Sequence, residues 1–173
     1  ETVACLHIED MLQASDRYPH SKYSLEFSDI MGRLVDLDAP KSTLLDAVRL
    51  YVYSYAIGNG DLHAKNISIQ RDPSSGSWSL TPAYDLLSTL PYRAALSDAE
   101  RMALALHDEA FGRFTREEFV CFGAEFGLSR PAVEKMVLGT AGRVLNAVDD
   151  LDVHLLGEWT LGEIRSRAIS LIA

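Results

Sequence analysis

The chain has 173 residues and is 47 % hydrophobic, which is enough for one substantial core and too little to demand two domains. Asp and Glu (25) outnumber Lys and Arg (16), and the formal net charge of −9 argues against a nucleic-acid-binding surface. No apolar run approaches the roughly 20 residues that a membrane span needs, and the opening residues ETVACLHIED lack the basic-then-apolar order of a signal peptide. Two distant cysteines, Cys5 and Cys121, indicate neither a zinc site nor a disulfide framework. We therefore expect one cytoplasmic domain over residues 1–173, with no membrane contact and any DNA contact made through a partner.

The first part of the chain predicts three helices. A short helix is expected over residues 3–14, and a second is expected to be capped by Ser24 and to run to about Val35. The third covers residues 40–57, with a proline in its first turn and a wide apolar face that predicts burial on most sides. Three tyrosines of this helix are interpreted as core or interface residues, the alternative being a stacking platform for bases: Tyr51, Tyr53 and Tyr55.

The stretch GNGDLHAKN at 58–66 contains an aspartate and an asparagine at a spacing that suits phosphoryl transfer. Four residues separate Asp61 from Asn66, as they separate the catalytic Asp from the metal-holding Asn of protein kinases. A tight loop of this kind can aim a carboxylate at an attacking hydroxyl and an amide oxygen at Mg²⁺, which prefers oxygen ligands. Asp61 is expected to orient the hydroxyl and accept its proton, and Asn66 is expected to bind the metal. A simple turn is the alternative, because Gly, Asn and Asp dominate turns.

A short β-hairpin is predicted after this motif. Residues 67–70 and 78–80 read as strands, and the intervening RDPSSGS at 71–77 is dense in turn-forming residues. The hairpin would bring Asp85 back beside Asn66, so that Asp85 supplies the second, anionic metal ligand. Asn66 and Asp85 are therefore the candidate ligands of Mg²⁺ and its bound nucleotide.

The roles of several neighbouring side chains stay open. His63 is a candidate catalytic residue, and a role in orienting the loop through backbone hydrogen bonds is preferred to direct catalysis. Lys65 is a candidate to reach a phosphate or the substrate hydroxyl, although exposed lysines are commonly just solvated. The segment after Asp85 has no clear hydrophobic period and contains Thr89, Tyr92 and Arg93. These three residues are candidate substrate contacts, and the alternative interpretation is an irregular surface loop.

The segment after the motif begins ambiguously, since residues 101–106 fit either a strand or a short helix. Thr115 and Glu118 then form a capping box that predicts the start of a helix, and Gly127 predicts its end. The capping box satisfies free backbone N–H groups at the helix start, and glycine readily adopts the left-handed conformation that ends a helix. A helix over about 116–126 is therefore expected.

Two more helices complete the prediction. Ser129 is expected to cap a long helix with Pro131 in its first turn. Thr160 and Glu163 repeat the capping-box pattern and predict the start of a last helix. The expected fold is mainly α with one small β-hairpin that carries the chemistry.

GNGDLHAKNISI followed by LTPAYDLLST resembles the catalytic core of HipA-type serine/threonine kinases, the toxins of bacterial toxin–antitoxin pairs. The residues that carry the resemblance are Gly58, Asp61, His63, Lys65, Asn66, Ser68, Pro82, Tyr84 and Asp85. The resemblance covers most of residues 5–150 and implies the C-terminal lobe of a protein-kinase-like fold. It also implies ATP and Mg²⁺ as cofactors, with the base at Asp61 and the metal ligands at Asn66 and Asp85. The partners that it implies are a helix-turn-helix antitoxin (HipB-like) and a translation-related protein substrate such as an aminoacyl-tRNA synthetase.

Two other functions stay open. GDLHAKN is also close to the GDLHxxN loop of aminoglycoside and choline kinases, although the setting of Asp85 in Ala-Tyr-Asp-Leu favours the HipA type. The chain has neither a Gly-x-Gly-x-x-Gly loop nor a Val-Ala-Ile-Lys-like strand, and the HipA-type family places its nucleotide-gripping parts in an N-terminal lobe. Without an initiating Met, Glu1 is interpreted as not the natural start, and the fragment is expected to bind ATP weakly and to be inactive alone. A non-catalytic partner-binding module is the second alternative.

Overall fold

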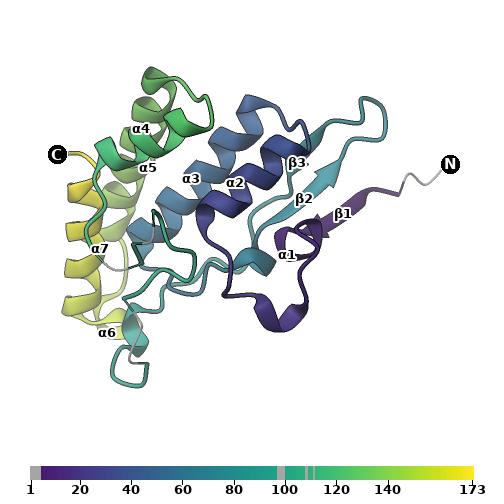
Figure 1. The fold of residues 1–173 in the computed structure, drawn as a ribbon. Coiled ribbons are helices and arrows are strands. Elements are labelled where there is room, and N and C mark those ends of the chain that lie inside the picture. Colours follow the sequence, from purple (N-terminus) through teal and green to yellow (C-terminus); the bar gives the residue numbers. More distant parts are fainter. Residues whose placement is uncertain (1–4, 97–99, 108, 111) are drawn as a thin grey trace, which may run out of the picture.

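The computed structural model of the protein describes residues 5–96, 100–107, 109–110 and 112–173. The described part is mostly helical and carries a small three-stranded antiparallel sheet (Figure 1). The strands are β1 (His7–Asp10), β2 (Ser68–Arg71) and β3 (Trp78–Leu80). The α-helices are α1 (Met11–Ala14), α2 (Phe27–Asp36), α3 (Lys41–Ile57), α4 (Arg116–Glu125), α5 (Arg130–Val148), α6 (Val153–Leu156) and α7 (Glu158–Ser170). Short 3₁₀ turns cover Pro19–Ser21, Ala64–Asn66 and Leu90–Tyr92. The fold class predicted from the sequence is confirmed.

The sheet has the order β1-β2-β3, so the predicted β2–β3 hairpin is present and a third strand flanks it. β1 pairs antiparallel with β2, with His7 opposite Arg71. The helix predicted over residues 3–14 is therefore wrong for His7–Asp10, while residues 3 and 4 lie outside the described part. Only Met11–Ala14 is helical, because the Asp10 side chain accepts a hydrogen bond from the Gln13 main-chain N–H at 2.8 Å and starts a helix there.

The second predicted helix exists but begins later than expected. It is α2, and its N-cap is Glu26, which forms a reciprocal capping box with Asp29. The Ser24 hydroxyl instead donates to the Ser21 carbonyl at 2.8 Å and closes the preceding turn. The third predicted helix is confirmed as α3, with Pro40 at its N-cap position.

The core gathers around one face of α3, where aromatic rings from three helices meet. Tyr51 is fully buried, its ring centroid lies 4.4 Å from that of Phe27, and its hydroxyl donates to the Leu104 carbonyl at 2.7 Å. Tyr55 is also fully buried, and its hydroxyl accepts the Phe114 N–H at 3.0 Å. The interpretation as core residues is confirmed for Tyr51 and Tyr55, which are buried and whose hydroxyls both have partners inside the protein, but not for Tyr53. Tyr53 points the other way and is 36 % exposed.

The segment after the site contains one confirmed capping box. Thr115 and Glu118 open α4 as predicted, and the helix is followed by Gly127 at a φ of +71°. Residues 101–106 form neither a helix nor a strand; Leu106 makes a single β-bridge with Glu109. Arg101–Leu106 is thus held by isolated main-chain bonds rather than by a regular element.

The last part of the chain departs from prediction at one helix start. α5 begins after Ser129 as expected, although the Ser129 side chain makes no capping bond. α7 begins at Glu158 rather than at Thr160, after the short α6 that the sequence did not indicate. The predicted capping box at Thr160 and Glu163 is therefore wrong: Thr160 is buried inside the helix, and Glu163 faces Arg167 and Arg113.

α3 runs through the middle of the molecule and joins its two sides (Figure 1). It packs against α2 and β3 on the sheet side and against α5 and α7 on the other side. The loop at its C-terminal end contains the GNGDLHAKN stretch at 58–66 and leads to β2. None of the described helices is both long enough and apolar enough to cross a membrane.

Candidate active site

The candidate catalytic loop begins where α3 ends in a left-handed glycine. Gly58 has a φ of +69°, and a Cβ built on it would lie 2.3 Å from Leu90 Cδ1. A side chain is excluded there both by the backbone conformation and by the lack of space. Gly58 thus lets the chain turn sharply off the helix while Leu90 packs directly on the turn.

Asn59 links the catalytic loop to the segment that carries Asp85. Its side chain is fully buried, its Oδ1 accepts the Asp61 N–H at 3.2 Å, and its Nδ2 donates to the Asp85 carbonyl at 3.5 Å. One buried amide therefore contacts the main chain of both candidate functional aspartates. Sequence reasoning placed Asn59 only in a turn, because its second partner lies 26 residues away along the chain.

Thr89 makes a second link between the same two segments. Its hydroxyl donates to the Gly58 carbonyl and accepts the Gly60 N–H, both at 3.0 Å, and it is buried. Thr89 is thus part of the loop's support, and its burial does not fit the substrate contact proposed for it. Tyr92 and Arg93 are exposed, and the Arg93 guanidinium lies 3.7 Å from the ring centroid of Trp159, a cation–π contact.

Asp61 lies at the surface end of the loop and is held by a tyrosine from a distant segment. The Tyr23 hydroxyl donates to Asp61 Oδ1 at 2.9 Å. The side-chain Nδ2 of Asn66 donates to the Asp61 carbonyl at 3.0 Å. Because a carbonyl can only accept, this bond identifies the remaining atom of the Asn66 amide, Oδ1, as the one that can face a cation.

Asp85 sits in a strained backbone conformation beside this loop. Its φ is +54°, which is uncommon for a residue with a side chain, and its side chain is exposed. The neighbouring Tyr84 hydroxyl donates to the Lys65 carbonyl at 2.6 Å and lies 2.7 Å from Ser68 Oγ. The hairpin therefore returns the segment that carries Asp85 to the catalytic loop, and the bonds of Tyr84 and of the Asp85 carbonyl hold the main chain of that segment there.

His63 is buried next to a lysine that the motif does not include. Its Nε2 lies 3.2 Å from Lys22 Nζ, and its ring meets the Tyr23 ring edge-on at 5.4 Å between centroids. Burial, and then the charge of Lys22, lower the pKa of His63 from its ordinary value. The His63 main-chain carbonyl accepts the Asn66 N–H at 2.8 Å, whereas its buried Nδ1 has no hydrogen-bond partner among the described residues. The His63 main chain thus makes a bond within the loop, and its ring contacts Lys22.

The structure joins all five predicted site residues into one bonded unit, largely through their main chains. Asp61, His63 and Asn66 are connected directly through the loop, and the Asp85 main chain joins them through Asn59. Lys65 adds its main-chain carbonyl to this unit, while its side chain is exposed and makes no hydrogen bond to the described residues.

Lys22 and Tyr23 were missed by sequence reasoning. They lie in the segment at 15–23, which reads only as a loop, and their contacts to the motif span 38 residues or more. No local signal in that segment points to Asp61 or His63. An adjacent basic and aromatic residue is too common a pattern to indicate a site without a structure.

The donor set fits a magnesium ion that takes most of its ligands from elsewhere. No group of three or more His, Cys, Asp or Glu side chains within the described ranges could hold a metal ion alone. Mg²⁺ in phosphoryl-transfer sites is commonly held by only one or two protein oxygens, the rest coming from phosphates and water. One carboxylate, from Asp85, and one amide oxygen, from Asn66, match that demand.

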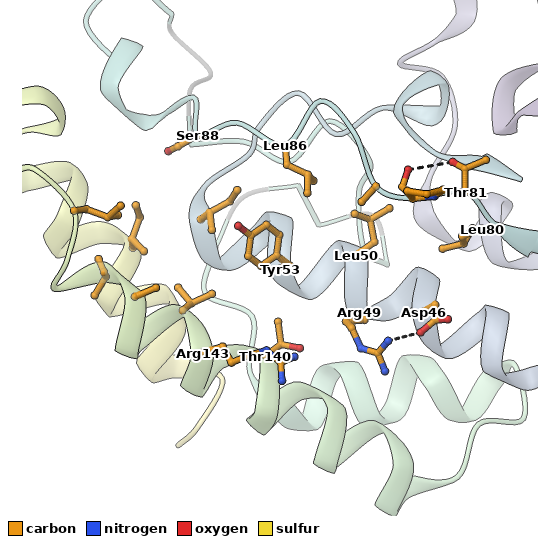
Figure 2. A pocket seen from close by; sticks show the side chains of 18 of the residues that line it. Asp46, Arg49, Leu50, Tyr53, Leu80, Thr81, Leu86, Ser88, Thr140 and Arg143 are labelled. Carbon is orange, nitrogen blue, oxygen red and sulfur yellow. Dashed lines mark hydrogen bonds and ion pairs between the residues drawn. The ribbon is translucent and has the colours of Figure 1, made fainter.

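A separate apolar cavity of about 890 Å³ opens behind the Asp85 segment (Figure 2). Leu50 and Tyr53 of α3 face it on one side, Thr140 and Arg143 of α5 on another, and Leu86 comes from the Asp85 segment (Figure 2). The candidate catalytic residues do not line it. The segment that carries Asp85 therefore has the catalytic loop on one side and this cavity on the other.

Comparisons with known proteins identify relatives of this chain. The chain is 33 % identical over 141 residues to the Sinorhizobium fredii protein named "Putative kinase Y4dM", and 30 % identical over 156 residues to "Putative kinase Y4mE" of the same organism. These matches cover 79 % and 84 % of this chain, but only 32 % and 36 % of the relatives. The chain thus spans about a third of the length of the curated relatives that it matches.

Two solved structures share the fold. HipA of Shewanella oneidensis MR-1, solved with HipB and its operator DNA, matches with a TM-score of 0.78 at 20 % identity, over 96 % of this chain and 44 % of that one. The Helicobacter pylori proinflammatory kinase CtkA matches with a TM-score of 0.53 at 12 % identity, over 95 % and 66 %. The HipA-like C-terminal domain family matches residues 2–148. The chain therefore belongs to the HipA-like C-terminal domain family and is related to proteins named as putative kinases.

Proposed function

We propose that this chain carries the catalytic lobe of an ATP-dependent serine/threonine protein kinase of the HipA type. Asp61 is the general base, and Asn66 and Asp85 are the protein ligands of Mg²⁺. The single observation that carries the proposal is the link made by Asn59 and Thr89, which ties the loop holding Asp61 and Asn66 to the segment holding Asp85. A turn without a chemical role has no need of a distant aspartate held in a strained conformation beside it.

The reaction that these residues support is transfer of the γ-phosphoryl group of ATP to a protein hydroxyl. Asp61 orients the acceptor hydroxyl and takes its proton as the hydroxyl oxygen bonds to the γ-phosphorus and the bond from phosphorus to ADP breaks. Tyr23 fixes the carboxylate by donating to Oδ1, which leaves Oδ2 for the substrate. When bound, Mg²⁺ neutralises charge on the phosphates, and Asn66 and Asp85 supply the oxygens that hold it.

The other predicted site residues have supporting roles in this proposal. His63, neutral because burial lowers its pKa, positions the loop and the neighbouring Lys22 rather than transferring a proton. The exposed side chain of Lys65 contacts the incoming acceptor or a phosphate. Because this chain spans about a third of its curated relatives, we propose that the groups gripping adenine lie in the remainder of such proteins. The described chain alone would then bind ATP weakly and not turn over.

Membership of the family suggests two kinds of partner for the whole protein. We propose a helix-turn-helix antitoxin as binding partner, with DNA reached only through it, in the cytoplasm. The likeness in fold to a toxin solved together with HipB and operator DNA supports this choice. A translation-related protein, such as an aminoacyl-tRNA synthetase, is the proposed substrate.

The test is transfer of radiolabelled γ-phosphate from ATP by the full-length natural chain, with protein acceptors in one arm and aminoglycosides or choline in another. Asp61→Asn should abolish transfer while magnesium-dependent ATP binding persists. The matched control is Asp150→Asn, an exposed aspartate whose side chain has no partner among the described residues, and it should leave transfer unchanged. Full transfer by Asp61→Asn overturns the assignment of the base, and transfer only to small molecules overturns the protein substrate.

A further inference from the structure

The neighbourhood of Asp61 contains a cation whose charge no carboxylate neutralises directly. Lys22 comes from the segment between α1 and α2 and is half-buried over the catalytic loop. Its ammonium contacts His63 Nε2 at 3.2 Å and lies 4.6 Å from the ring centroid of Tyr23. No carboxylate of the described residues lies within ion-pair distance of it. The positive charge is thus placed by a neutral ring and an aromatic face.

The direction of the contact with His63 is fixed by chemistry. A lysine ammonium can only donate, so His63 Nε2 must accept and the imidazole must be neutral. Burial of His63 and the charge of Lys22 both favour the neutral ring. The ammonium therefore keeps donors that the ring does not use.

Lys22 also lies within the electrostatic reach of both candidate functional aspartates. Contact with Tyr23 is the largest cause that raises the pKa of Lys22, burial opposes it, and the charges of Asp61 and Asp85 add to the rise. The ammonium is thus charged at neutral pH and close enough to Asp61 and Asp85 for both charges to act on it. In the proposed reaction, the transferred phosphoryl group passes between the base and the metal ligands.

A phosphoryl group in this space needs such a cation. Asp61 and Asp85 both repel the negative oxygens of a phosphate, and fixed positive groups aimed at developing charge lower the barrier of transfer. Lys65, the lysine inside the motif, has an exposed side chain without a hydrogen-bond partner among the described residues. Lys22 is the lysine that the fold holds in position, through His63 and Tyr23.

Resting on the phosphoryl-transfer function proposed above, we infer that Lys22 binds the γ-phosphoryl group of ATP during transfer, with His63 and Tyr23 as its positioning residues. Tyr23 then has two tasks, since its hydroxyl holds Asp61 while its ring lies against Lys22. Lys22 and Tyr23 would together align the phosphoryl group with the acceptor hydroxyl at Asp61. The segment at 15–23 thereby becomes part of the site.

The test compares ATP with ADP, because only ATP has the γ-phosphoryl group. Kd values for Mg-ATP and Mg-ADP are measured by calorimetric titration of the full-length natural chain, unaltered and with Lys22→Met, Lys22→Arg or Lys135→Met. Lys135 is an exposed lysine of α5 without a side-chain partner among the described residues, so it controls for loss of charge. Thermal unfolding of each variant shows whether the fold persists.

Lys22→Met is expected to weaken Mg-ATP roughly 10- to 100-fold, as loss of one charged hydrogen bond does, and to leave Mg-ADP unchanged. Lys22→Arg should restore part of the preference for ATP, and Lys135→Met should change neither Kd. Equal weakening of both nucleotides by Lys22→Met, or no weakening of either, overturns the inference. If the unaltered protein binds neither nucleotide, the proposed function fails and this inference fails with it. If Asp85→Ala weakens Mg-ATP while Lys22→Met does not, only the role of Lys22 is wrong.

Discussion

Thr89 donates twice to one carbonyl: its main-chain N–H and its hydroxyl reach the Gly58 oxygen at 2.9 and 3.0 Å. The same hydroxyl accepts the Gly60 N–H, so a single side chain closes the turn that leads into Asp61. The segment after Asp85 and the start of the catalytic loop therefore form one unit. Local opening of either segment should disturb the other.

Replacing Thr89 by valine, which keeps the shape and removes the hydroxyl, is expected to lower the free energy of unfolding by about 1–3 kcal/mol because the Gly60 N–H loses its partner. Transfer and Mg-ATP affinity should fall as well, since the loop is no longer tied to the Asp85 segment. Chemical denaturation and calorimetric titration measure the two effects. Thr81→Val is the control, because among the described residues the Thr81 hydroxyl reaches only the adjacent Pro82 carbonyl, at 3.3 Å. Equal behaviour of the two variants would refute the structural role of Thr89.

Gly58 and Gly142 offer a contrast between a required glycine and a tolerated one. Gly58→Ala should be strongly destabilising, since a left-handed residue with a side chain costs about 1–2 kcal/mol and the new Cβ also collides with Leu90. Gly142 lies inside α5 with nothing within 4 Å of a built Cβ, so Gly142→Ala should stabilise the protein by up to about 1 kcal/mol. The midpoints of denaturant-induced unfolding measure the change in stability of each variant. Similar shifts of the same sign would contradict the turn described for Gly58.

Tyr51 and Tyr53 lie two positions apart on α3, but Tyr51 is buried and Tyr53 is exposed. Tyr51→Phe leaves the buried Leu104 carbonyl without its 2.7 Å bond and should cost about 1–3 kcal/mol of the free energy of unfolding. Tyr53→Phe should change stability by less than about 0.5 kcal/mol, because its hydroxyl has no partner among the described residues. Both values come from chemical denaturation. A loss at Tyr53 as large as that at Tyr51 would contradict this account of the core.

Glu163 should make stability depend on pH. Burial acts to raise its pKa, but the hydrogen bonds from Arg113 (2.6 Å) and Arg167 (2.9 Å) outweigh burial and hold the pKa below its ordinary value. A lowered folded-state pKa gives stability that is fully present above the ordinary value and is lost as the pH falls through the folded value.

Glu163→Gln is therefore expected to be less stable than the unaltered protein near pH 7 by roughly 1–3 kcal/mol. The difference should shrink once the pH falls below the ordinary glutamate value of about 4.3. Urea denaturation across this pH range measures it. Glu134→Gln is the control, since the exposed pair of Glu134 with Arg130 should contribute less than about 1 kcal/mol at any pH. A difference at Glu163 that does not change with pH would contradict the assignment.

The sequence predicted those elements whose signals are local. A short stretch of sequence is enough to predict each of three elements: α3, the β2–β3 hairpin and the capping box of Thr115 and Glu118. β1 was missed because its backbone partners are residues 68–71, about 60 positions away, and nothing within residues 7–10 reveals that pairing. The false capping box at Thr160 arose because Glu163 has the right spacing, while Gly157 allows the helix to start earlier.

The residues of the candidate site also divide into those with a local sequence signal and those without one. The spacing of Asp61 and Asn66, and the return of the chain after the hairpin, could be read from residues 58–85 alone. Lys22 and Tyr23 could not, because only folding brings the segment between α1 and α2 over the loop. The support from Asn59 and Thr89 was likewise invisible, since it depends on main-chain partners more than 25 residues away.

The measurement that tests the central claim most directly is calorimetric titration of ATP into the full-length natural chain, with and without Mg²⁺, for the unaltered protein, Asp85→Ala and Asp150→Ala. Magnesium-dependent binding that Asp85→Ala weakens at least about tenfold, as loss of a charged ligand should, and that Asp150→Ala leaves intact would agree with a metal-assisted phosphoryl-transfer site. Binding that needs no Mg²⁺, binding that Asp85→Ala leaves unchanged, or no binding at all would contradict it.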